Sequence, residues 1–138
     1  MLITAGATRN PIDSIRCITA NASGKTGAYI AETLKNLTQT TILGSNVALL
    51  HAPKGISPIE FTSTRDLESR MKSWVLQNPN GVVVHSSAVG DFEFSGATLD
   101  SKIPSGLDEI NLKLTPTPKI LPQIKAWSNS VSIISFKA

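Results

Sequence analysis

The sequence predicts an α/β fold, a doubly wound, mostly parallel, Rossmann-like sheet with helices on both faces. Short β-rich runs alternate with segments of helical periodicity, which is typical of βαβ units. The unbroken β-branched run from Val82 to Val84 indicates a strand that is covered on both faces. No repeat, low-complexity tract or linker interrupts the 138 residues, of which 41% are hydrophobic. We therefore expect one domain over residues 1–138.

The first half of the chain predicts three strands and one helix. Residues 2–4 form a short strand that breaks at Gly6, and a polar stretch follows over residues 8–22. Residues 27–37 are predicted as a helix, because Ile30, Leu34 and Leu37 have the i, i+4, i+7 spacing of one helix face. Residues 41–43 and 59–61 are predicted as the second and third strands.

A second helix is predicted after residue 63. Ser63 and Asp66 have the spacing of a capping box, and Leu67, Met71 and Val75 then form a buried stripe. The segment Asn-Pro-Asn-Gly at residues 78–81 predicts the turn that ends this helix.

The last part of the chain predicts three strands, a loop and a helix. Residues 82–86 form the clearest strand, residues 91–108 a loop, and residues 110–114 a half-buried strand. Thr117 and Pro118 predict an N-cap and a first-turn proline for a helix that runs to about residue 127. Pro122 is too deep in that helix, so the helix either starts late or is kinked. Residues 131–136 are the last predicted strand.

Composition argues against several classes of protein. The net charge is +3, but the basic residues are scattered singly, so we expect no nucleic-acid partner. Every apolar run is far shorter than the roughly 20 residues that cross a bilayer, so we expect no membrane partner. With one cysteine there is no intramolecular disulfide, and no export signal is apparent, so we expect a cytoplasmic location.

The first candidate site is the segment Ser23, Gly24 and Lys25 at the start of the first predicted helix. It is not a P-loop, because Thr19 stands where that motif needs glycine and the preceding strand is too distant. Free backbone N–H groups at a helix start favour an anion. Two interpretations stay open: an anion site, or a Ser23 N-cap with glycines that allow close packing.

Further candidates follow the first strand and the strand at residues 82–86. Gly6 lacks the companion glycines of a dinucleotide fingerprint, and a single glycine in a turn is more often structural. After the later strand, small residues allow a flat ring to approach, and Asp91 is either a ribose acceptor or a loop cap. His85 and Ser86 are not a hydrolase pair, because adjacent strand residues point to opposite faces.

Lys102 lies in a loop that contains Gly96, Pro104 and Gly106. A flap lysine can neutralise charge in a transition state, although most loop lysines are simply solvated. We expect no metal site made of protein ligands, because Cys17, His51 and His85 lack any ligand spacing.

Taken together, these segments resemble the phosphopantothenate–cysteine ligase (phosphopantothenoylcysteine synthetase) family. Residues 6–13 are similar to its G-x-T-x-x-P-I-D loop, and residues 14–27 to its V-R-x-I-x-N-x-S-S-G-K-x-G segment. Residues 87–92 resemble A-A-V-A-D-Y, and Lys102 with Ile103 resembles the flap motif that begins K-I. Residues 117–120 match T-P-K-I, and residues 135–138 resemble the start of G-F-K-[AL]-E-T. The resemblance spans nearly the whole chain, and its start at Met1 is similar to the free-standing bacterial type.

The resemblance implies a reaction of coenzyme A biosynthesis. The carboxylate of 4′-phosphopantothenate is activated by CTP or ATP with Mg²⁺, and the amine of cysteine then attacks the acyl-nucleotide intermediate. Family members are dimers, so a homodimer is implied here. By position, the catalytic residues are Lys102, Asn21 and Arg16. The implied nucleotide-binding residues are Gly6, Ser86, Ser87, Ala88, Asp91, Phe136 and Lys137, and those for phosphate or substrate are Ser23, Gly24, Lys25 and Ala20.

The chain departs from the family pattern at one functional position. Ala20 stands where the family has asparagine, and Asn21 comes one residue later. The family also continues beyond residue 138 with further elements. Two alternatives follow: a relative or fragment that binds nucleotide or phosphopantothenate without turnover, or a nicotinamide-dependent reductase, which the missing fingerprint disfavours.

Overall fold

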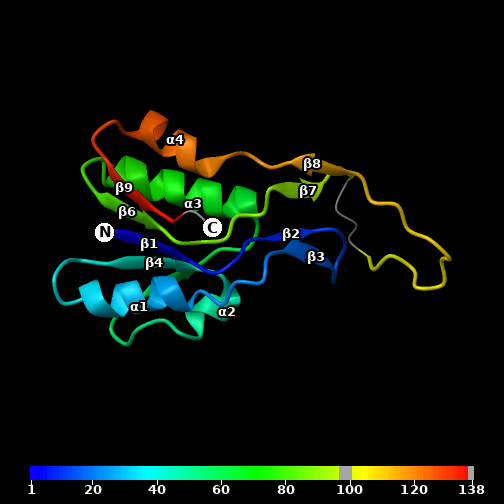
Figure 1. The fold of residues 1–138 in the computed structure, drawn as a ribbon, viewed down its shortest axis with the longest axis horizontal. Helices are drawn as coiled ribbons and strands as arrows, with labels where there is room; N and C mark the ends of the chain where they lie inside the picture. Colours follow the sequence, from blue (N-terminus) through cyan, green and yellow to red (C-terminus); the bar gives the residue numbers. More distant parts are fainter. Residues whose placement is uncertain (97–100, 137–138) are drawn as a thin grey trace.

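The computed structural model describes residues 1–96 and 101–136, and its centre is a five-stranded parallel sheet (Figure 1). The strand order is β5-β4-β1-β6-β9, in which every neighbouring pair is parallel. The bounds are β1 Leu2–Ala5, β4 Thr41–Gly44, β5 Pro58–Glu60, β6 Val82–His85 and β9 Ser132–Ser135. The predicted Rossmann-like sheet is confirmed. Strands are added on one side of β1 first and on its other side from β6 onwards, so the strand order reverses between β1 and β6. Sheets of this type bind ligands at such a switch point.

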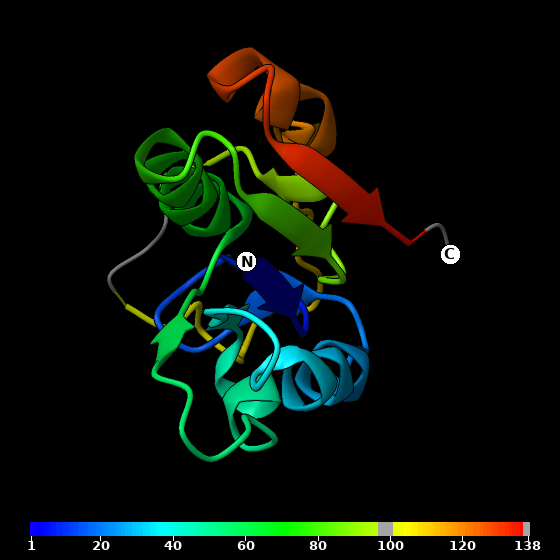
Figure 2. The ribbon, with the colours of Figure 1, turned by 90° about the vertical axis from the view of Figure 1, so that its left-hand side faces the viewer.

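Helices cover both faces of the sheet, as Figure 2 shows with α1 and α2 on one side and α3 and α4 on the other. The helix bounds are α1 Lys25–Leu34, α2 Asn46–Leu49, α3 Thr64–Gln77 and α4 Ile120–Trp127. Alternate residues of β1 serve the two cores. Leu2 packs with α3 and α4, whereas Ile3 and Ala5 pack with Ala31 and Ala48 of α1 and α2.

The face of α1 that meets the sheet agrees with the predicted one in part, because Ile30 packs against the core and Leu37 does not. Leu37 lies beyond the helix with 78% of its surface exposed, and the buried residues are Gly27, Ala28 and Ala31. A Cβ at Gly27 would lie 2.6 Å from the Cβ of Ala5. The helix packs closely on β1 at Gly27, where only a small residue fits, and Ile30 of the predicted stripe packs beside it as a partly buried residue.

The helix α3 matches its prediction. Ser63 accepts a hydrogen bond from the backbone N–H of Asp66, and Leu67, Met71 and Val75 are buried. The reciprocal contact differs from a full capping box, because Asp66 accepts from the N–H of Thr62 instead of that of Ser63.

The last helix starts late, which was one of the two predicted outcomes. Lys119 is the N-cap of α4, so Thr117 and Pro118 precede the helix and do not cap it. Pro122 is then the third residue of α4, where the backbone N–H has no intrahelical partner to lose.

Two short hairpins project beyond the carboxyl edge of the sheet (Figure 1). They pair β2 Arg9–Pro11 with β3 Cys17–Thr19, and β7 Phe92–Phe94 with β8 Leu114–Pro116. Sequence analysis missed β2, β3 and β7, and its strand over residues 110–114 is wrong. Ile110 and Leu112 are exposed, so their alternation did not mark a buried face.

Candidate functional site

The site is built where the loops after β1 and β6 run side by side. Ala88 donates its N–H to the carbonyl of Gly6 at 2.8 Å and accepts from the N–H of Thr8 at 3.1 Å. Ala7 and Ala88 form an isolated parallel bridge that continues the pairing beyond the strands. These paired loops separate two cavities at the carboxyl edge of the sheet, one on each side of the switch point.

Threonines from the β1 side fix the course of the β6 loop. Thr4 Oγ1 accepts the backbone N–H bonds of Ser86 and Ser87 at 3.1 Å each. Thr8 Oγ1 accepts the N–H of Gly90 at 2.8 Å. The loop that carries the predicted Ser87 and Asp91 is therefore held by fixed backbone contacts and does not depend on its own small side chains.

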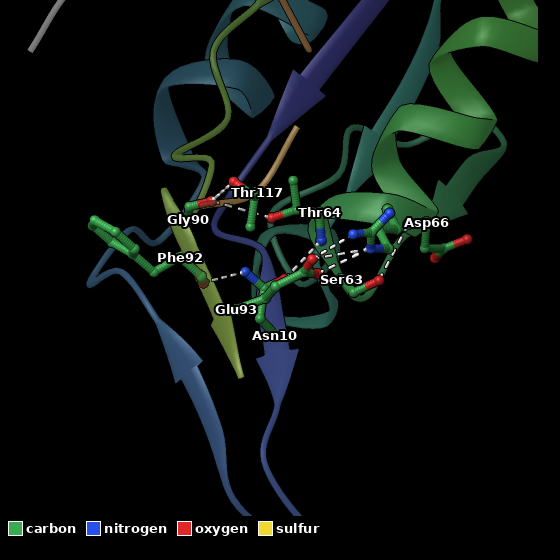
Figure 3. A network of polar contacts seen from close by, with 9 residues as sticks. Asn10, Ser63, Thr64, Asp66, Gly90, Phe92, Glu93 and Thr117 are labelled. Carbon is green, nitrogen blue, oxygen red and sulfur yellow. Dashed lines mark hydrogen bonds and ion pairs between the residues drawn. The ribbon is translucent and has the colours of Figure 1, made fainter. Parts of the chain in front are cut away.

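A second polar network joins the hairpins to the helix starts, as Figure 3 shows. Asn10 donates to the carbonyl of Phe92 and accepts from the backbone N–H of Thr64, both at 2.9 Å. Thr117 Oγ1 donates to the carbonyl of Gly90 at 2.6 Å, and the N–H of Thr117 bonds to the carbonyl of Asp91. The network sets the approach of the α4 start to the β6 loop, and sequence analysis assigned no role to Asn10.

The first cavity, called here the β6–α4 cavity, has a volume of about 350 Å³. Its polar lining comes from His85, Ser87 and Asp91, and Asp91 forms an ion pair with Lys119. The remaining lining is mostly apolar: Val89, Thr117, Pro118, Ile120, Leu121, Pro122 and Phe136. A flat, mostly apolar ring with a polar edge suits such a lining.

His85 is a buried residue of this cavity that sequence analysis dismissed. Its Nδ1 lies 2.9 Å from Thr4 Oγ1, and 9% of the residue is exposed. Burial lowers the pKa of His85 from its ordinary value of 6.5, so the imidazole is neutral at pH 7. Ser87 Oγ is buried without a hydrogen-bond partner in the described part of the chain.

The second cavity, called here the β3–α2 cavity, has a volume of about 270 Å³. Within residues 1–96 and 101–136, Arg9 is the one charged residue that lines it, and no carboxylate of those residues does. The remaining lining residues are mostly small or polar: Ala7, Thr19, Ala20, Asn21, Ala22, Ser23, Ser45, Asn46 and Val47. Such a lining suits an anionic or strongly polar group better than an apolar ring.

The start of α1 borders this second cavity and is shaped by Gly24. Gly24 is the N-cap of α1 with φ +76°, and a Cβ there would lie 2.2 Å from the Cβ of Ala48. Gly6 has φ +85° and packs against Ser45, the N-cap of α2, in the same way. Both glycines permit a close approach of backbone segments that a side chain would block.

The predicted site residues therefore divide between two places. Ser87, Asp91 and Phe136 line the β6–α4 cavity, and Gly6, Ser86 and Ala88 lie in the paired loops beside it. The β3–α2 cavity takes Ala20, Asn21 and Ser23, with Gly24 and Lys25 at the adjacent start of α1. Lys137 lies outside the described residues.

Arg16 and the segment after Lys102 come together at Asp13, a residue to which sequence analysis gave no role of its own. The buried carboxylate of Asp13 accepts from the guanidinium of Arg16 at 2.7 Å and from the backbone N–H of Ile103 at 2.9 Å. The hydrogen bond from Ile103 is the main cause that lowers the pKa of Asp13 to about 2, with further backbone bonds from Ile15 and Arg16. The base of the predicted flap is thus fastened to the β2–β3 hairpin, while Lys102 itself is exposed and lines neither cavity.

Over residues 1–96 and 101–136, no group of three or more His, Cys, Asp or Glu side chains is placed to hold a metal ion. None of the four helices in those same residues has the length and apolar character that crossing a membrane requires.

Comparison with known proteins gives one family over the whole chain. The family model described as "DNA/pantothenate metabolism flavoprotein C-terminal domain" matches residues 1–138. The coenzyme A biosynthesis bifunctional protein CoaBC of Thermococcus kodakarensis is 35% identical over 143 residues, which cover 100% of this chain and 34% of that protein. The CoaBC protein of Bacillus subtilis is 30% identical, again over 100% of this chain and 34% of its own length. The chain thus spans about a third of the length of these relatives.

Solved structures show the same fold. The DNA/pantothenate metabolism flavoprotein from Streptococcus pneumoniae superposes with a TM-score of 0.84 at 30% identity, over 99% of this chain and 68% of that one. The C-terminal domain of a CoaBC protein superposes with a TM-score of 0.76 at 26% identity, over 96% of this chain and 60% of that one. A Cab2 mutant in complex with phosphopantothenate-cysteine has a TM-score of 0.78 at 20% identity, which supports the fold alone.

Proposed function

Because the chain belongs to the DNA/pantothenate metabolism flavoprotein C-terminal domain family, we propose that it joins 4′-phosphopantothenate to cysteine through an acyl-nucleotide intermediate. The observation that carries the proposal is the pair of unlike cavities on either side of one switch point. A ligase of this kind holds a nucleoside triphosphate and an acidic second substrate at once, and two adjoining cavities of different character suit that need.

The nucleotide occupies the β6–α4 cavity. The apolar wall of Ile120, Leu121 and Phe136 covers the faces of the base, and the Asp91 carboxylate accepts from ribose hydroxyls. Among the described residues, the one cation that lines the cavity is Lys119, which is paired with Asp91, and we place the triphosphate towards the mouth of the cavity. CTP and ATP are both candidates for this co-substrate.

The phosphopantothenate end of the reaction lies at the β3–α2 cavity. Arg9 supplies positive charge there, and the start of α1 presents backbone N–H groups that favour an anion. The family has a functional asparagine at the position of Ala20. Asn21 replaces it here, because Ala20 and Asn21 line this same cavity. Its amide holds the acyl intermediate while the amine of cysteine attacks the acyl carbon.

The chemistry consists of two substitutions, the first at the α-phosphorus of the nucleotide and the second at the acyl carbon of the intermediate. The carboxylate oxygen of phosphopantothenate attacks the α-phosphorus of the nucleotide, and pyrophosphate leaves. The cysteine amine then attacks the acyl carbon, the nucleoside monophosphate leaves, and the amine proton is lost to solvent or a nearby base. This chain's residues position the reactants and stabilise charge, with Lys102 acting on the intermediate from its loop.

Mg²⁺ is carried by the triphosphate. Asp91 is the one carboxylate that lines either cavity in the described residues, and it is paired with Lys119. A single carboxylate together with phosphate oxygens is a donor set that Mg²⁺ accepts when it keeps several waters. Asp91 is the described residue that would contribute a ligand to the ion, which would neutralise charge on the phosphates when bound. The active unit is a homodimer.

The test is a coupled assay with 4′-phosphopantothenate, cysteine and Mg²⁺, run in parallel with CTP and ATP. We expect pyrophosphate release that depends on cysteine, with one nucleotide preferred. Absence of release from a chain that still binds nucleotide would contradict turnover.

Binding without turnover is the second candidate function, and Ala20 is the observation that favours it. Loss of one hydrogen-bond donor to a reacting group costs about 10²–10³ in rate. An Ala20→Asn variant separates the two functions, because it raises the rate of an impaired ligase and leaves a pure binding protein inactive.

A further inference from the structure

The β6–α4 cavity contains a histidine whose protonation pattern is fixed by its neighbours. Thr4 Oγ1 accepts from two backbone N–H groups, those of Ser86 and Ser87. A hydroxyl oxygen has two lone pairs and one proton, so the proton of Thr4 is left to be donated. Its remaining neighbour is Nδ1 of His85 at 2.9 Å, which must therefore be the acceptor.

It follows that the proton of the neutral imidazole is on Nε2. Protonation of both ring nitrogens would point an N–H at an oxygen whose lone pairs are already occupied. The Nε2 atom makes no hydrogen bond within the described residues. It is also not fully buried, unlike Ser87 Oγ. Since His85 lines the β6–α4 cavity, the Nε2–H donor is accessible from that cavity.

Ser87 supplies an independent sign that a polar ligand atom belongs here. Its Oγ is buried without a partner in the described part of the chain. An unsatisfied buried polar group costs about 1–3 kcal/mol, so native proteins keep few of them without a reason. His85 and Ser87, each with a polar atom that has no hydrogen-bond partner in the described residues, thus line a cavity whose other walls are largely apolar.

We propose that His85 is a base-reading residue, which donates its Nε2–H to an acceptor atom, a ring nitrogen or carbonyl oxygen, on the edge of the bound nucleobase. Ser87 supplies the second polar contact to the same edge. Asp91 and His85 then contact different parts of the nucleotide. Ribose hydroxyls are donors and suit the acceptor Asp91, whereas an acceptor atom of the base suits the neutral donor Nε2–H of His85. This inference rests on the proposed function.

Two substitutions at His85 separate its two ring nitrogens. His85→Asn keeps an acceptor near the Nδ1 position, so the bond from Thr4 survives while the cavity donor is lost. His85→Gln places an amide N–H near the Nε2 position and keeps the donor. The matched control is His51→Asn, the same change at the exposed second histidine of the chain.

Dissociation constants are measured by calorimetric titration with CTP and ATP, and with the nucleosides cytidine and adenosine. We expect His85→Asn to weaken binding of the preferred nucleotide about tenfold, and His85→Gln to stay within about threefold of the unchanged protein. The loss is expected to be equal for nucleoside and triphosphate, and His51→Asn is expected to bind normally. In the free protein, ¹⁵N chemical shifts of His85 are expected to show a neutral ring protonated on Nε2.

Three results would overturn the inference. The first is unchanged affinity of His85→Asn for both triphosphates, and the second is a ring protonated on Nδ1. A loss seen with triphosphate but not with nucleoside would assign His85 to the phosphates instead of the base. If the unchanged chain bound no nucleotide at all, the proposed function would fail together with this inference. If the chain bound nucleotide and His85→Asn bound it equally well, this inference alone would fail.

Discussion

The two cavities on either side of the switch point differ in how they are built. The β6–α4 cavity has large apolar walls from α4 and the end of β9, with polar atoms from His85 and Ser87. The β3–α2 cavity has small side chains, Arg9 and the adjoining starts of two helices. One edge of one sheet therefore offers a place for a flat ring and a place for a charged group. Under the proposed function, the switch point would set where the two substrates bind, and the elements that flank it would set which chemical group each cavity accepts.

The largest expected effect concerns Asn21 in the β3–α2 cavity. Asn21→Ala is expected to lower kcat about 10²–10³-fold, because it removes the one amide that takes the part of the family asparagine. The dissociation constant of the nucleotide is expected to stay unchanged. Cysteine-dependent pyrophosphate release measures the first quantity and calorimetry the second. The control is Asn36→Ala, at an exposed asparagine far from both cavities in the fold. Equal kcat in both variants would remove Asn21 from the reaction.

Phe136 gives the next largest effect, on the other side of the comparison. Loss of an aromatic ring that stacks on a base costs about 1–3 kcal/mol, which corresponds to about 5- to 150-fold in affinity. Phe136→Ala is expected to weaken nucleotide binding within that range. Ile134→Ala removes an equally exposed apolar side chain two residues earlier on β9 and is expected to have little effect. A matching loss in both variants would indicate damage to the edge strand instead of a lost contact with the base.

Asp13 provides a pH-dependent test of the hairpin that carries Arg9 and Thr19. The pKa of Asp13 is lowered from 3.8 to about 2, so its stabilising contribution is complete above about pH 4 and is lost as the pH falls towards 2. Asp13→Asn is expected to lower Tm at pH 7. The Tm difference from the unchanged protein is expected to shrink between pH 4 and pH 2. A difference that stays constant over this range would mean that the charge of Asp13 is not what fastens Ile103 and Arg16.

The smallest expected effects are changes in the free energy of unfolding when one serine of each cavity is replaced by alanine. The two changes are expected to differ in sign or size. Ser45 caps α2 through a hydrogen bond from the N–H of Ala48, so Ser45→Ala is expected to destabilise the protein by about 1 kcal/mol. Ser87 Oγ has no such partner, so Ser87→Ala is expected to be neutral or slightly stabilising. Urea unfolding measures both changes. Destabilisation by Ser87→Ala comparable to that of Ser45→Ala would show that Ser87 is already satisfied in the free protein.

The sheet and α3 could be predicted because their signals are local. Leu67, Met71 and Val75 face a single core, and the run from Val82 to Val84 lies between two cores, with Val83 in one and Val84 in the other, so in both segments the sequence pattern matches the pattern of burial. The packing of α1 could not be predicted in this way. The distance between α1 and β1 is short because Gly27 packs against Ala5, and a hydrophobicity pattern does not predict such a contact between small residues.

The hairpins and the cavity floor could not be predicted, for a different reason. β2 and β7 are three residues each, and Asn10 contacts Phe92 and Thr64 only after the chain has folded back on itself. The motifs assigned Ser87 and Asp91 to the nucleotide and Asn21 to catalysis, but they gave no reason to expect two separate cavities for these residues. His85 was missed because its role depends on Thr4, which is 81 residues away in the sequence.

The most direct test of the two-cavity account is to follow backbone amide ¹H–¹⁵N shifts as the two substrates are added in turn. Nucleotide alone is expected to shift the amides of residues 85–91, of residue 117 and of residues 119–121, and to leave those of residues 19–23 and 45–47 in place. Addition of 4′-phosphopantothenate is then expected to shift that second set. Nucleotide shifts confined to residues 19–23 and 45–47 would contradict the account, because they would place the base in the cavity proposed for the acidic substrate.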